Sequence, residues 1–86
     1  MKNYAERIVA VMQEEGITID YSGEDLDLRE YIIDSLQFIE FIVDIENRFQ
    51  IEIPDDQLRF ETIASLHSFA QLIAICDKEN YDEASK

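Results

Sequence analysis

The sequence is poor in cysteine, glycine and proline. It has one cysteine in 86 residues, which excludes an internal disulfide, and its single histidine leaves no Cys/His set for a zinc site. Two glycines and one proline leave few places where a helix must end. The fold must therefore be held together by packing, and we expect it to be all-α.

Basic residues are also scarce, with seven Lys and Arg against twenty Asp and Glu, and the formal net charge is -13. Such a charge repels phosphate backbones and anionic membrane surfaces, so we expect no nucleic-acid partner. No apolar run approaches the roughly 20 residues that a membrane-spanning helix needs, and the N-terminus lacks a secretory-signal pattern. We therefore expect a cytoplasmic protein that does not insert into a membrane.

What the sequence does contain is helical periodicity. The spacing predicts a first helix over residues 3–15 that ends at a glycine. A long loop, with at most a short helical turn, is predicted over residues 17–33. Asp34 is the predicted N-cap of a second helix over residues 35–49, with Gln37 completing a capping box.

Two more helices are predicted behind Pro54, which cannot continue the second helix. One of the two aspartates that follow the proline caps a short third helix over residues 55–60. Thr62 or Ser65 caps the last helix, in which apolar residues recur at three- and four-residue spacing as far as Cys76.

The predicted second helix carries two apolar arcs. One is the expected core-facing stripe: Phe38, Phe41, Ile42, Ile45 and Phe49. Leu36, Ile39 and Val43 form a second arc about 140° away, bordered by acidic residues. A small domain cannot easily bury both arcs. The second is either a docking surface for basic patches on partner enzymes, or it is covered because the domain wraps this helix or dimerises through it.

Several motifs together resemble those of the phosphopantetheine-binding carrier proteins, which carry acyl or peptidyl groups. Asp34-Ser35-Leu36 opens the acidic second helix, Ile53-Pro54-Asp55 follows its end, and residues 62–66 are similar to the lead into the family's last helix. The resemblance covers most of the chain. It implies a four-helix bundle of acyl-carrier type, with a long loop between the first two helices and a short third helix.

The resemblance also implies a covalent cofactor and its site. Ser35 would be the attachment point of 4'-phosphopantetheine, which a phosphopantetheinyl transferase takes from coenzyme A with Mg²⁺, and Asp34 would lie beside it. A serine just inside a helix N-terminus is exposed, and the helix dipole there favours a phosphate. The implied positions for partner recognition are Leu36, Ile39, Glu40, Val43 and Glu46.

The implied function is that of a free-standing, monomeric carrier without catalysis of its own. It would hold acyl or aminoacyl groups as thioesters and present them to loading, elongating and transferring enzymes in fatty-acid, polyketide, nonribosomal-peptide or related biosynthesis. Ile32 occupies a position where many carriers have glycine, so the cargo and subclass stay open. The alternative is an acidic helical adaptor that binds a basic partner without a prosthetic group.

The remaining candidate residues have simpler interpretations. Asp25-Leu26-Asp27 lacks the later ligands of a calcium loop. His67 is interpreted as a surface or boundary residue, and Cys76 as a buried small apolar group. The predicted carrier domain covers residues 1–77, and the polar segment 78–86 is predicted to fray.

Overall fold

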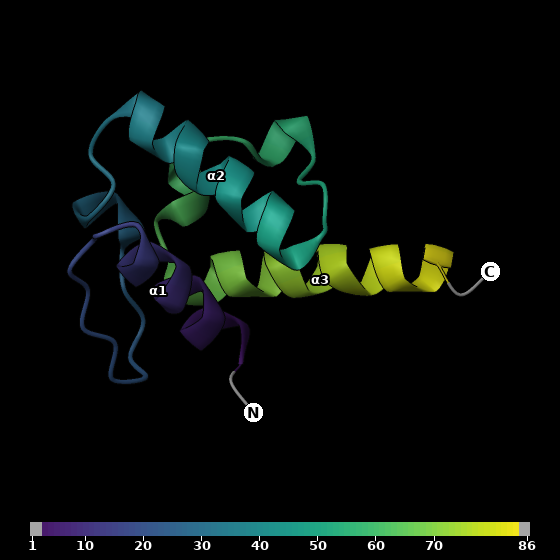
Figure 1. The fold of residues 1–86 in the computed structure, drawn as a ribbon, viewed down its shortest axis with the longest axis horizontal. Helices are drawn as coiled ribbons and strands as arrows, with labels where there is room; N and C mark the ends of the chain where they lie inside the picture. Colours follow the sequence, from purple (N-terminus) through teal and green to yellow (C-terminus); the bar gives the residue numbers. More distant parts are fainter. Residues whose placement is uncertain (1–2, 85–86) are drawn as a thin grey trace.

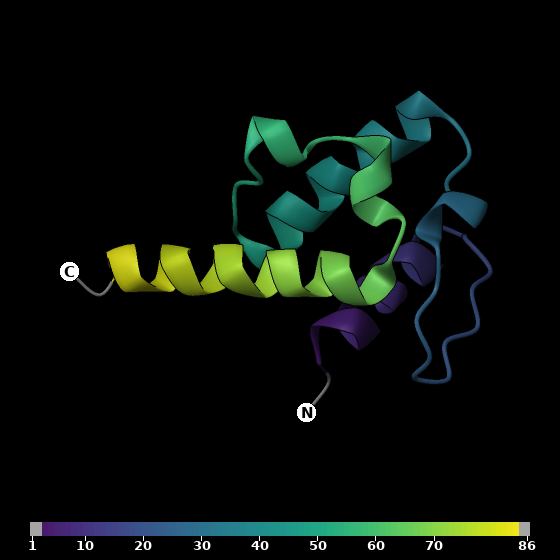
Figure 2. The same ribbon diagram turned by 180° about the vertical axis from the view of Figure 1, so that it is seen from behind.

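The computed structural model describes the backbone of residues 3–84 and the side chains of residues 3–77. Within that range the chain folds into three α-helices, α1 (Tyr4–Glu14), α2 (Ser35–Phe49) and α3 (Leu66–Ala84), joined by loops with short 3-10 turns. The first two helices lie against one half of α3, whose C-terminal turns extend beyond them (Figure 1, Figure 2). The all-α prediction is confirmed. No helix in the described part of the chain is long and apolar enough to cross a membrane.

The predicted short third helix does not form as one helix, and the four-helix bundle is not confirmed. The segment forms two separate 3-10 turns, η2 (Asp55–Gln57) and η3 (Phe60–Ile63). Leu58, with ψ 62, and the extended Arg59 interrupt the helical backbone between them. The aspartates do not act as caps, because η2 begins directly after Pro54 and no side chain caps it. Without a cap and with a break after one turn, an α-helix is not nucleated here.

The structure also decides which residue caps α3 and how far this helix extends. Ser65 is the cap of this helix, because its Oγ accepts the Ser68 N–H at 3.1 Å. The Thr62 hydroxyl instead donates to the Gln57 carbonyl at 2.6 Å. The backbone of residues 78–84 continues α3 where a frayed tail is predicted, and residues 85–86 lie outside the described range. The domain limit at residue 77 stays a prediction.

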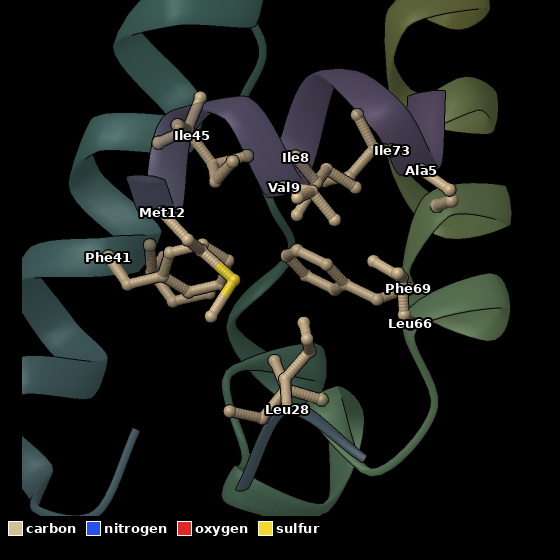
Figure 3. Close-up of a cluster of buried hydrophobic side chains, with 14 of the residues drawn as sticks. Ala5, Ile8, Val9, Met12, Leu28, Phe41, Ile45, Leu66, Phe69 and Ile73 are labelled. Atoms are coloured by element: carbon tan, nitrogen blue, oxygen red, sulfur yellow. The ribbon is translucent and has the colours of Figure 1, made fainter. Parts of the chain in front are cut away.

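The core lies where the three helices meet. Figure 3 shows their side chains pointing toward one another, with Leu28 of the first loop closing one side. Phe41 of α2 and Phe69 of α3 are completely buried, with ring centroids 5.7 Å apart. Cys76 is buried as predicted. The predicted core stripe of α2 is confirmed in full, since these residues are all buried: Phe38, Phe41, Ile42, Ile45 and Phe49.

The long loop before α2 is anchored to the core rather than loose. Leu28 begins the short turn η1 (Leu28–Glu30) and is completely buried, as is Ile32. At the position where many carriers have glycine, this chain therefore has a core side chain, that of Ile32. The next residue, Ile33, faces outward instead and is 78% exposed.

The loop is also pinned to the start of α3. The Asp25 carboxylate accepts the Ser65 hydroxyl at 2.6 Å and the His67 N–H at 2.9 Å, and these hydrogen bonds lower the pKa of Asp25. His67 Nε2 lies 2.9 Å from the Tyr21 hydroxyl. These groups hold the loop in place, so His67 is a boundary residue, as predicted.

Candidate functional site

Ser35 lies at the tip of α2, where the helix begins. Asp34 caps the helix, and its Oδ1 accepts the Gln37 N–H at 2.7 Å. The Gln37 side chain reaches back to the Ile33 N–H at 3.2 Å instead of the Asp34 N–H, so the predicted capping box is incomplete. Ser35 is exposed, and its hydroxyl makes no hydrogen bond within the described side chains. The Ser35 hydroxyl is thus presented to solvent at a capped helix end.

An apolar face surrounds this hydroxyl. Leu36 is 69% exposed, Ile39 51% and Val43 48%, so the described part of the chain does not cover the second arc of α2. The alternative in which the domain wraps α2 is wrong. Two exposed residues outside the helix extend the face, Ile33 and Phe60. The place of Ile33 in this face could have been predicted from its position beside buried Ile32. No local sequence pattern marks Phe60 as part of the face.

A hollow of about 410 Å³ opens directly beside Ser35. Phe38 and Phe60 pack edge to face in its lining, with ring centroids 5.9 Å apart and planes at 86°. Phe38 thus serves both the core and the hollow, whereas Phe41 lies wholly in the core. The full lining is Ile33, Asp34, Ser35, Phe38, Ile39, Leu58 and Phe60.

The two acidic positions predicted for partner recognition differ in their surroundings. Glu40 is exposed on α2, one turn from Leu36. Glu46 is only partly exposed, and its Oε2 accepts the Ile53 N–H at 2.9 Å, which holds the loop that follows α2. Glu46 therefore has a structural function that the sequence analysis did not predict, and its recognition role stays a prediction.

A model of the family described as the phosphopantetheine attachment site matches residues 6–73, which is most of the chain. The chain belongs to this family. Comparison with the curated proteins and with the solved structures found no match.

The geometry at the tip of α2 fits the prosthetic group of a phosphopantetheine carrier. 4'-Phosphopantetheine is the covalent cofactor of this carrier domain. An exposed hydroxyl can be esterified without unfolding, and the N-terminal amides and dipole of α2 favour the phosphate that esterification brings. The adjoining apolar hollow offers a surface to the less polar part of the arm. Carrier domains of this family are generally non-catalytic and interact with modifying and biosynthetic enzymes.

Proposed function

We propose that this carrier is an acyl or aminoacyl carrier whose 4'-phosphopantetheine arm is esterified to the Ser35 hydroxyl. The observation that carries the proposal is the exposed serine at a capped helix N-terminus inside an Asp34-Ser35-Leu36 motif. The arm supplies a terminal thiol that holds the acyl or aminoacyl group as a thioester. Fatty-acid, polyketide, nonribosomal-peptide and related pathways all use cargo of this chemistry.

The role of Ser35 is that of an acceptor. In the loading step its oxygen attacks the phosphorus on the pantetheine side of coenzyme A. The bond from that phosphorus to the bridging oxygen of the diphosphate breaks, and adenosine bisphosphate leaves with that oxygen. The serine proton passes to a base that the transferase supplies. Asp34 Oδ1 accepts the Gln37 N–H and so fixes the helix end that presents the Ser35 hydroxyl.

The apolar face of α2 is proposed as the docking surface for the transferase and the later enzymes. Leu36, Ile39 and Val43 supply apolar contact at its centre, and Glu40 supplies a charge at its edge. An apolar centre with a charged rim is typical of a protein interface, and the net charge of -13 steers basic partner surfaces toward it.

Loading of the purified apo chain tests the proposal. The chain is incubated with a phosphopantetheinyl transferase, coenzyme A and Mg²⁺, and its intact mass is measured. We expect one phosphopantetheine per chain, located on the peptide that contains Ser35. An acidic adaptor without a prosthetic group gains no mass, and that result would overturn the proposal.

Val43→Asp is expected to impair docking without unfolding the domain. Val43 is 48% exposed, so the charge is not forced into the core, but it removes apolar contact from the interface. Burial of such a side chain contributes about 1.5 kcal/mol or more, so the apparent KM of the transferase should rise about tenfold with kcat little changed.

Ile75→Asp provides the matched control, because Ile75 is 56% exposed but lies on α3. It should leave the KM near that of the wild type. Thermal unfolding of both variants completes the test. A large drop in melting temperature for Val43→Asp, or an equal rise in KM for Ile75→Asp, contradicts the docking surface.

A further inference from the structure

Exposed apolar side chains are concentrated around the hollow beside Ser35. Six large apolar side chains are exposed in the described part of the chain, and three of them line this one hollow: Ile33, Ile39 and Phe60. Exposed apolar patches commonly mark ligand-binding grooves or protein interfaces. The volume of about 410 Å³ lies within the range of about 300–1,000 Å³ that is typical of small-molecule sites. The hollow is therefore large enough and apolar enough to hold a small apolar group.

One wall of the hollow comes from the segment between η2 and η3. Leu58 and Phe60 both line the hollow, whereas Arg59 between them is extended and exposed. The Thr62 hydroxyl donates to the Gln57 carbonyl at 2.6 Å, which ties the two turns together across this break. The interrupted helical backbone thus supplies two apolar side chains to one wall and holds them there.

The opposite wall belongs to α2. Phe38 is buried in the core yet also lines the hollow, and its ring meets the Phe60 ring edge to face, with centroids 5.9 Å apart. The two walls are therefore joined by an aromatic contact. Ser35 belongs to the same lining, so an arm that is esterified to it begins beside these rings.

The chemistry of the arm changes along its length in a way that matches this lining. Next to its phosphate, 4'-phosphopantetheine has a methylene and then a quaternary carbon that bears two methyl groups. The hydroxyl and the two amides come only after that carbon. The N-terminus of α2 suits the phosphate. The first group beyond the phosphate is compact and apolar, and its removal from water into the hollow is favourable.

We propose that Phe60, with Phe38 and Ile39, forms a seat in this hollow for the geminal dimethyl group of the arm. The inference rests on the proposed attachment of the arm to Ser35. These residues hold only the first part of the arm, and its amides and terminal thiol extend beyond them. Ile39 also belongs to the docking surface of α2, so the seat lies at one edge of that surface. Phe60 thereby sets the direction in which the arm leaves the tip of α2.

NMR of the loaded carrier tests the seat through the two methyl signals of the arm. The ring currents of Phe38 and Phe60 should displace these signals from their positions in free coenzyme A. The two displacements should be unequal, because the methyl groups lie at different places relative to the rings. An isotope-filtered NOE spectrum of labelled protein with an unlabelled arm should also show contacts between these methyl groups and the Phe60 ring.

Two substitutions of Phe60 separate the effect of its ring from that of its apolar bulk. Phe60→Ala opens the seat, so it should weaken the NOE contacts to the arm and reduce the displacement of the methyl signals. Phe60→Leu keeps an apolar side chain at this position, so the contacts should remain while the displacement is reduced. Ile75→Ala is the matched control, because Ile75 is 56% exposed on α3 and does not line the hollow. It should leave the signals as they are in the wild type.

The outcomes that contradict the seat are distinct from those that contradict the proposed function. Methyl signals of the loaded carrier at their positions in free coenzyme A, without contacts to the Phe60 ring, overturn the seat alone. An unchanged displacement in Phe60→Ala, or an equal change in Ile75→Ala, also overturns it. A chain that gains no phosphopantetheine overturns the proposed function and this inference with it, and the intact mass distinguishes that failure from the others.

Discussion

Ser35→Ala is expected to abolish phosphopantetheine loading. The substitution removes the oxygen that forms the phosphoester, and the residues on either side of it, Asp34 and Leu36, carry no hydroxyl. The fold should be almost unaffected, because the Ser35 hydroxyl makes no hydrogen bond within the described side chains and Asp34 still caps the helix. We expect the free energy of unfolding to change by no more than about 0.5 kcal/mol. Intact mass after incubation with the transferase measures the first effect, and urea unfolding measures the second.

Ser22→Ala is the matched control for this experiment. Ser22 is also exposed, but it lies in the long loop before α2 and not at a helix N-terminus. This variant should gain one phosphopantetheine as the wild type does. If Ser35→Ala is still loaded, the arm is attached elsewhere and the assignment of Ser35 fails.

Phe41→Ala should be the most destabilising single change among those considered. Phe41 is completely buried and packs on Phe69, so its removal leaves a cavity at the centre of the core. Phe→Ala changes at such sites cost about 3–5 kcal/mol. A domain of this size is stable by only roughly 4–13 kcal/mol, so a large part of the stability is lost. Urea unfolding monitored by circular dichroism measures the change.

Phe60→Ala removes the same ring from a site that is 39% exposed. Its cost should be about 1 kcal/mol, most of it from the lost edge-to-face contact with Phe38. Equal destabilisation by the two substitutions would mean that the core is not centred on Phe41.

Local sequence patterns predicted the helices that have strong caps and a periodic apolar face. The N-cap at Asp34 was readable, and Ser65 was one of the two caps predicted for α3, because a cap is a contact between residues three apart. The core stripe of α2 was readable for a similar reason, since the helical repeat alone brings its residues together. The Asp34-Ser35-Leu36 motif indicated the proposed attachment site because the chemistry proposed for it depends on this one helix end.

The failures arose where distant residues decide the outcome. The segment after Pro54 has acidic residues and apolar spacing that suit a short helix. Leu58, however, lines the hollow beside Ser35, and its backbone lies outside the helical region. Glu46 has the spacing of a surface acid, but it accepts a hydrogen bond from Ile53 in the loop that folds back on it. Neither contact has a signature in the neighbouring sequence.

The order of amino acids alone determined an all-helical acidic domain with a serine at the start of its second long helix, because helix caps and helical periodicity are interactions within a few residues of one another. Only the tertiary structure decided which face of α2 is exposed and how Ile33 and Phe60 complete the apolar face. Those features require segments far apart in the chain to come together, and side-chain packing between the helices selects that arrangement.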